Sequence, residues 1–298
     1  MMNTPSFGNE YFAFNKDLGR PMVPTADHYP STDSQDNPVV PLTDEQRYRF
    51  DKDGWLLVPG VLNDEDIAEM REFVIRLHTE PESIPEHERS SIGGPLQRLT
   101  DHPVVVGFMN EFVYHPFTDG TKTPPLGNEN CYGFRFEMTF SQYRHKGDGH
   151  FGPHNGSGAL RLPGDHHTYH YFPGHAHTAL TRALWELNPV NEGDGGTLFV
   201  NGSHKAAFTA PESIRDKDSV LWRDYACPAG SVVFFTEAVT HSSTFWTSET
   251  PRVAVFNSYN AIGNKWHNWD PHPELLDQMP AKRKTLFRPV YVSHNVIT

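Results

Sequence analysis

Hydrophobic residues follow two different periods along the chain, and the change of period separates a helical part from a strand-rich part. The segment Thr43–Gln46 has the spacing of a capping box and predicts a short helix that ends at Asp53. Asn63 is expected to cap a second helix with one apolar face, and His102–Tyr114 is predicted as a third helix. Between the first two helices, Trp55–Pro59 is expected to form a buried strand. The apolar face of the second helix consists of Ile67, Met70, Phe73, Val74 and Leu77.

From residue 131 onward the period becomes two, which is typical of strands with one buried face. In the first of these strands, 133–143, aromatic and aliphatic residues alternate with polar ones. Glycine- and proline-containing turns separate several later segments of the same kind. These further strands are predicted at 178–187, 197–201, 231–236, 252–259 and 285–292. The pattern therefore predicts a mainly β fold, a sandwich or barrel, with flanking α-helices.

The chain is expected to contain one domain. Residues 1–40 are rich in Pro, Asp, Asn and Ser and show no sustained periodicity, so they are predicted to form an N-terminal extended arm. Residues 41–298 contain no repeat of fixed period and no heptads, and they are interpreted as a single domain.

The composition limits the classes of binding partner and the cellular setting that can be expected. A net charge of −12 argues against nucleic acid or an anionic membrane as the main partner. The N-terminus lacks the pattern of a secretory signal, no apolar run is long enough to span a bilayer, and there are only two cysteines. These features predict a reducing, cytoplasmic setting and leave the oligomeric state open. Eight of the 18 histidines crowd into residues 145–177, which is where chemistry is expected.

A second histidine-containing segment suggests a specific kind of chemistry. His241 follows the apolar strand 231–236, and Arg252 opens the next one. Two adjacent antiparallel strands would bring an imidazole, which binds Fe(II) well, and a guanidinium, which holds a carboxylate with two hydrogen bonds, into one cavity. Ser243 would add a hydroxyl to that carboxylate. Singly, such a histidine is more often a surface group and such an arginine more often pairs with a surface carboxylate; the spacing of the two favours the chemical interpretation.

Several segments resemble the phytanoyl-CoA dioxygenase-like family, and they occur in the family's order between about residues 42 and 260. They are Leu42–Gln46, Asp53–Leu62, Leu184–Lys205 with its Gly-Ser-His end, and the strand before His241 together with the spacing to Arg252. The resemblance implies a double-stranded β-helix (jelly-roll, cupin-like) core that binds Fe(II) and 2-oxoglutarate and uses O2. It also implies that His154 and His241 bind the metal and that Arg252, with Ser243, binds the co-substrate.

The sequence departs from the family at one metal ligand. The family's first histidine is followed two residues later by Asp or Glu, whereas Gly156 follows His154. A carboxylate from another part of the chain could complete the metal site. The candidates are Asp165, Glu186 and Glu237. Glu237 lies only four residues before His241, so on a straight strand it would be more than ten ångströms away, and it reaches the metal only if the chain turns sharply.

Two alternatives leave the third metal position without a protein ligand. Chloride at the position that Gly156 leaves free would make the protein an Fe(II)/2-oxoglutarate-dependent halogenase. Two histidines with water would give either an oxygenase with an open ligand position or a non-catalytic cupin-like binding protein. The favoured prediction is a dioxygenase that hydroxylates or otherwise oxidises an unactivated C–H bond of a small molecule. The His166–His177 segment is expected to line the mouth of the cavity, and His204 is expected to be structural.

Overall fold

A computed structural model describes residues 29–114, 127–154, 167–172 and 174–290, together with the short paired strands β1 (Ala13–Phe14) and β2 (Pro21–Met22). Most of the predicted arm, and the positions of Asn155, Gly156 and Asp165, lie outside the described residues. The halogenase hypothesis therefore concerns a position that the structure does not describe.

The helices begin where the sequence places their caps. Helix α1 (Asp44–Asp53) has the complete capping box of Thr43 and Gln46, and it ends at Gly54, whose φ of 82° suits glycine. Helix α2 (Asp64–Thr79) is capped by the Asn63 side chain, and α3 (Pro103–Phe112) follows His102. All three confirm the predictions. The short 3-10 helices are η2 (Pro81–Ser83), η3 (Glu86–Glu88), η4 (Gly94–Leu99), η5 (Ser203–Lys205) and η6 (Glu212–Arg215).

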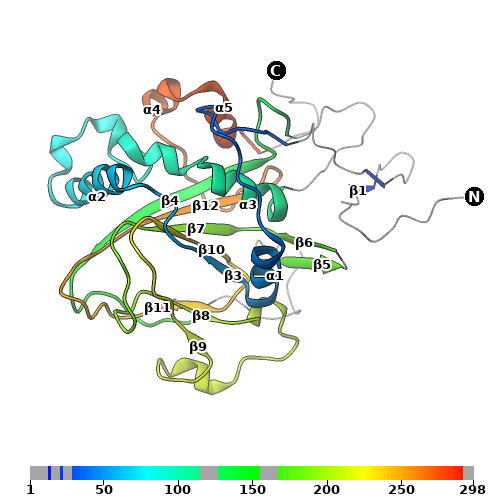
Figure 1. Cartoon of the computed structure of the whole chain (residues 1–298), viewed down its shortest axis with the longest axis vertical. Helices are drawn as coiled ribbons and strands as arrows, with labels where there is room; N and C mark the ends of the chain where they lie inside the picture. Colours follow the sequence, from blue (N-terminus) through cyan, green and yellow to red (C-terminus); the bar gives the residue numbers. More distant parts are fainter. Residues whose placement is uncertain are drawn as a thin grey trace, which may run out of the picture.

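A five-stranded antiparallel sheet forms the centre of the molecule (Figure 1). In spatial order its strands are β3 (Trp55–Val58), β10 (Ser231–Thr236), β7 (Thr181–Glu186), β12 (Arg252–Ala261) and β4 (Phe134–Arg144). One face packs against the helices; there Phe234 stacks on Phe108 of α3 with ring centroids 4.1 Å apart. The largest hydrophobic core lies between this face and the helices.

The opposite face of this sheet packs against a smaller antiparallel sheet. Its order is β11 (His241–Ser243), β8 (Thr197–Val200) and β9 (Trp222–Arg223), and Figure 1 shows it on the side away from α2 and α3. A second core fills the space between the sheets, with Phe235 and Phe256 from one side and Phe199 and Trp246 from the other. The predicted mainly β architecture with flanking helices is confirmed.

Strand β4 differs from its prediction because it contains a bulge. The pairing with β12 matches Phe136 to Tyr259 and Met138 to Ser258, so Glu137 has no opposite residue. Phe136 consequently joins the helix-side core, whereas Phe140 packs against the core between the sheets. The strand was expected to bury a single face; it buries residues on both.

The C-terminal part contains a further correction. The predicted strand 285–292 is wrong where the structure describes it, since η7 (Thr285–Phe287) is helical and no strand follows up to residue 290. The helix η7 directly follows α5 (Ala281–Lys284). A buried ion pair between Arg283 and Asp101 holds α5 in place. Leu286 is buried in the helix-side core, so its apolar side chain is accounted for without a strand. The remaining elements are α4 (Pro273–Gln278) and the hairpin β5 (Tyr169–Phe172) and β6 (His175–Thr178). None of the described helices is long and apolar enough to cross a bilayer.

Candidate metal centre

A backbone contact places the two predicted metal-binding histidines side by side. His154 and His241 exchange both of their backbone hydrogen bonds, N to O at 3.1 and 3.2 Å, so the segment ending at His154 extends the smaller sheet beyond β11. Residues paired in this way project their side chains from the same face. The two imidazole rings accordingly lie 4.1 Å apart, centroid to centroid.

Both rings are oriented by a carbonyl group. Nδ1 of His154 lies 2.8 Å from the carbonyl oxygen of Gly152, and Nδ1 of His241 lies 2.9 Å from that of Val239. A carbonyl only accepts, so Nδ1–H donates in each ring and Nε2 of the neutral imidazole carries the lone pair. A second ring nitrogen bonded to a carbonyl is the usual arrangement of a metal-binding histidine.

The carboxylate of Glu237, one of the three candidates from the sequence, completes the group. Strand β10 ends at Thr236, and the chain turns there, with the Thr236 hydroxyl accepting from Ala238 N at 3.1 Å and Thr236 O accepting from Val239 N at 3.0 Å. Glu237 Oε2 therefore lies 3.7 Å from His241 Nε2. The sharp turn that the sequence analysis required for Glu237 to reach the metal is present, because residues 237–240 are not extended.

The electrostatics suit metal binding. Arg182 of β7 donates to Glu237 and also to the Ser258 hydroxyl, at 2.8 Å. Burial alone would raise the pKa of Glu237, but Arg182 and His241 lower it to about 2. Burial lowers the pKa of His241 to about 4, although Glu237 opposes this shift. At neutral pH the group thus consists of a carboxylate and a neutral imidazole, both in the form that binds a cation.

These side chains fit an iron ion by their chemistry and spacing. One ligand atom from each of His154, Glu237 and His241 lies within 4.8 Å of the other two. Adjacent ligands about 2.1 Å from a metal are about 3 Å apart, so modest side-chain rotations would bring all three into range. Two histidines and one carboxylate form the donor set typical of non-haem Fe(II) oxygenases. Across the described residues no other group of three His, Cys, Asp or Glu side chains comes this close.

A cavity of about 140 Å³ adjoins this group between the two sheets. It is lined from the larger sheet by Phe140, Gln142, Arg144, Arg182, Phe235, Arg252 and Phe256, and from the smaller sheet and its edge by His150, His154, Thr197, His241, Ser242 and Ser243. The predicted residues His154, His241, Ser243 and Arg252 therefore all reach one cavity. The predicted reason was wrong: the two strands in question, β10 and β12, are separated by β7, and His241 lies on β11 of the opposing sheet.

Arg252 forms an ion pair with an internal acid. Its Nε lies 3.2 Å from both carboxylate oxygens of Glu186, and its Nη2 donates to Oε1 of the same carboxylate. Burial would lower the pKa of Arg252, but Glu186 and Tyr225 raise it. Glu186 is therefore a partner of Arg252, which removes it from the candidate metal ligands.

Arg144 also lines the cavity, but the sequence analysis did not identify it as a site residue. It lies directly opposite Arg252 in the pairing of β4 with β12, and its Nη1 donates to Ser243 Oγ at 2.6 Å. The signal was present in the alternation of β4, since Phe140, Gln142 and Arg144 are two residues apart. The bulge concealed which face they occupy.

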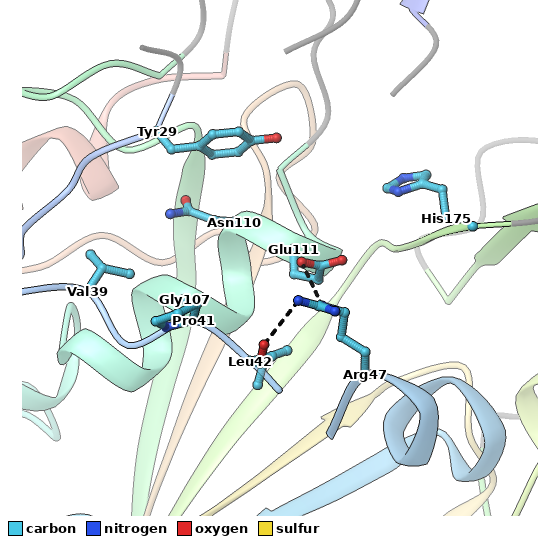
Figure 2. A pocket seen from close by; sticks show the side chains of 10 residues that line it. Tyr29, Val39, Pro41, Leu42, Arg47, Gly107, Asn110, Glu111 and His175 are labelled. Atoms are coloured by element: carbon cyan, nitrogen blue, oxygen red, sulfur yellow. Dashed lines mark hydrogen bonds and ion pairs between the residues drawn. The ribbon is translucent and has the colours of Figure 1, made fainter. Parts of the chain in front are cut away.

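The histidine-rich segment was expected to line the mouth of this cavity, and none of its described residues is among the lining, although His167, just before β5, contributes to lowering the pKa of Glu237. Tyr169 of β5 donates to Asp51 of α1 at 2.8 Å, and the hairpin contributes Tyr171 and His175 to another cavity, of about 520 Å³. A neighbouring cavity of about 280 Å³ is lined by α3, residues 29–42 and the Arg47 side chain, which bonds Leu42 O and Glu111 (Figure 2). His204 is structural, as expected, with Nε2 3.0 Å from Asp51 O.

Comparison with known proteins gives matches over most of the chain. Residues 50–254 match the phytanoyl-CoA dioxygenase (PhyH) family. Ectoine dioxygenase from Bordetella bronchiseptica is 24% identical over 264 residues, which cover 79% of this chain and 82% of that enzyme. In fold, the chain is similar to HygX from Streptomyces hygroscopicus with nickel and 2-oxoglutarate bound, at a TM-score of 0.59, 23% identity, and coverage of 76% and 90% of the two chains. EctD from S. alaskensis has a TM-score of 0.53 at 16% identity, with 88% and 91% covered.

Proposed function

Because the chain belongs to the phytanoyl-CoA dioxygenase family, we propose that it oxidises an unactivated C–H bond of a small molecule and that His154, Glu237 and His241 hold its iron. The observation that carries this proposal is the convergence of two carbonyl-anchored imidazoles and a charge-paired carboxylate beside a cavity that contains three arginines. We further propose that the two facing antiparallel sheets form a double-stranded β-helix core.

The family assignment confirms the predicted family, the enzyme class of 2-oxoglutarate-dependent dioxygenases and the cofactors Fe(II) and 2-oxoglutarate. HygX, for example, has been solved with iron bound and with nickel and 2-oxoglutarate bound. The roles of individual residues, the single domain over 41–298 and the cytoplasmic setting stay predictions.

The chain's own side chains supply three conditions for the reaction. Burial keeps His241 neutral, and Arg182 keeps Glu237 deprotonated, so neither ligand needs to lose a proton when the metal binds. The core between the sheets, with Phe140, Phe235 and Phe256, limits water at the cavity. Bound Fe(II) with 2-oxoglutarate and O2 supplies the oxidising chemistry, and the protein positions the substrate beside it.

Glu237 favours oxygenation over halogenation. A halogenase of this type leaves the third ligand position to chloride, whereas here a carboxylate already lies 3.7 Å from His241 Nε2. The same observation argues against a binding protein that lacks metal, because Glu237 and both imidazoles are held in a binding-competent arrangement by Arg182 and two backbone carbonyls.

An anaerobic titration tests the proposal. Fe(II) and 2-oxoglutarate added together to the wild-type protein should produce the visible charge-transfer band of a chelated 2-oxo acid, and His241→Ala and Glu237→Ala should abolish it. His87→Ala, which changes a histidine outside the cavity, is the matched control and should keep the band. No band in the wild-type protein at millimolar co-substrate would refute the proposal.

A second measurement separates the reaction types. Admitting O2 in the presence of chloride and analysing small-molecule products by mass should give succinate and oxygenated products. Chlorinated products would instead support the halogenase alternative, and succinate-free binding of a ligand would support the cupin-like binding protein.

A further inference from the structure

Two segments leave the larger sheet at the end where Glu237 lies. Strand β10 ends at Thr236, directly before Glu237, and β7 begins beside it, because Thr236 is paired with Thr181. Strand β12 ends at the same edge, since Tyr259 is paired with Thr181. The hairpin of β5 and β6, which precedes β7, and the loop 262–270, which follows β12, therefore both start next to the metal centre.

These two segments meet through a pair of aromatic rings. The rings of Trp266 in the loop and His167, two residues before β5, lie 5.7 Å apart, centroid to centroid, in an edge-to-face arrangement. His167 is also close enough to Glu237 to contribute to the low pKa of that carboxyl group. The Trp266 side chain nevertheless stays 54% exposed. Its indole thus presents a large apolar face to a molecule that approaches the metal centre from this end.

The bulge in β4 fixes the position of this loop. Oε1 of Glu137, the residue without an opposite partner, accepts hydrogen bonds from the backbone N of Trp266 at 2.7 Å and of His267 at 2.6 Å. Arg135 donates to the carbonyl oxygen of Asn264 at 3.2 Å, and both anchoring side chains are buried. The loop is therefore ordered before a molecule binds, which lowers the entropic cost of binding.

The strand face beside Glu237 continues to a buried amide. The Ser258 hydroxyl accepts from Arg182, the residue that holds Glu237, and Asn260 lies two residues further along β12 on the same face. Asn260 is fully buried, and its Nδ2 has no hydrogen-bond partner among the described residues. A buried donor without an acceptor is unfavourable, so an oxygen atom of a bound molecule would be stabilised there.

The positive side chains at this end of the sheet are each paired with a carboxylate. The pairs are Arg182 with Glu237, Arg135 with Glu137 at 3.8 Å, and Lys265 with Asp270 at 2.7 Å. Among these side chains neither an anion nor a cation finds a free counter-charge. Bringing a charged molecule out of water without a counter-charge is costly, so a neutral molecule is favoured.

We propose that the primary substrate is a neutral molecule with a flat apolar face, which packs against Trp266 and His167, and with an oxygen atom that accepts a hydrogen bond from Asn260. This inference rests on the proposed function and names the substrate class of its active site. Arg252, the predicted co-substrate residue, lies six residues before Ser258 on the same strand, roughly 20 Å away at about 3.3 Å per residue. The proposed substrate site therefore leaves the co-substrate end of the cavity free.

Three probes of nearly the same shape test the inference. Benzamide is neutral and has a carbonyl oxygen, benzamidine is a cation without an oxygen acceptor, and benzoate is an anion. Their binding to the protein loaded with Zn(II) and 2-oxoglutarate is measured by ligand-observed NMR. Benzamide should bind more tightly than either charged probe. Exchanging Zn(II) for paramagnetic Mn(II) should broaden the signals of bound benzamide, because the site adjoins the metal.

Variants separate the two contacts. Trp266→Ala should weaken benzamide and benzamidine alike, by roughly 3- to 10-fold, because both lose the indole face, and Trp266→Phe should restore most of the loss. Asn260→Leu should weaken benzamide by roughly 3- to 10-fold and leave benzamidine unchanged, because benzamidine has no acceptor oxygen. The matched controls are Phe208→Ala, an exposed aromatic residue after η5, and Asn257→Leu, an equally buried asparagine on the other face of β12. Neither control should change the binding of a probe.

The exposed position of Trp266 makes its truncation harmless to the fold, so the test does not depend on the buried variants. Undetectable benzamide binding, tighter binding of a charged probe, no broadening by Mn(II), or unchanged binding in Trp266→Ala would each overturn the inference. Equal losses in Asn260→Leu and Asn257→Leu would overturn the role of the amide. Absence of the charge-transfer band in the wild-type protein with Fe(II) and 2-oxoglutarate would instead contradict the proposed function, so the two failures are distinguishable.

Discussion

Replacing Glu186 by alanine is expected to destabilise the fold by about 3–5 kcal/mol, the usual cost of removing one partner from a buried ion pair. The structure supports a value in this range, because Arg252 is 1% exposed and Glu186 is fully buried. The substitution leaves a guanidinium in the core between the sheets, with only neutral acceptors from Gln142, Thr197 and Tyr225. A charge in such surroundings lacks both solvent and a counter-charge.

Thermal unfolding measures this effect. At about 2–4 °C per kcal/mol for domains of roughly 150–250 residues, the melting temperature should fall by roughly 6–20 °C. The double variant Glu186→Leu with Arg252→Met removes both charges and should be more stable than Glu186→Ala alone. The surface variant Glu192→Ala serves as control and should stay within about 0.5 kcal/mol of the wild type. A loss below about 1 kcal/mol for Glu186→Ala, or a double variant less stable than the single one, would refute the reasoning.

Three further predictions concern the metal centre and the helices. Glu237→Gln should lower the affinity for Co(II), used as an Fe(II) probe in a titration, by at least about tenfold, whereas Glu249→Gln on the surface should not change it. The pKa of His204 is lowered to about 4 by burial, against a usual 6.5, so the unfolded chain takes up this proton first; stability should fall as the pH drops from 6.5 to 4, and His204→Asn should flatten that slope in pH-dependent melting curves. Thr43→Ala removes the hydroxyl that caps α1 and should cost about 1 kcal/mol in denaturant unfolding; no change would show that Gln46 alone suffices as the cap.

Local signals in the sequence were sufficient for the helices and for several strands. Thr43 and Asn63 are followed by α1 and α2, and β10 spans the predicted residues 231–236, because caps and turn residues act within a few positions. The prediction of a strand at 285–292 was wrong because one apolar pair, Leu286–Phe287, is compatible with a short helix as well as with a strand.

The candidate site was predictable in part, for a physical reason. His154, His241 and Arg252 are recognisable by residue type and spacing, and all three line one cavity. Glu237 depends on a turn after Thr236, and the binding of Arg252 by Glu186 depends on pairing between strands that are far apart in the sequence. Such contacts form only once the sheets assemble, so a pattern along the chain does not contain them.

The bulge in β4 makes the position of a length change along this strand more important than its size. Glu137 has no residue opposite it, so a chain shortened at that point would keep the pairing on either side with β12. A chain shortened at Ser141 would instead turn Gln142 and Arg144 toward the helices and place Tyr143 in the cavity. Relatives that differ in length here would accordingly keep the cation at the cavity wall if the gap falls at the bulge and lose it if the gap falls between the bulge and Arg144.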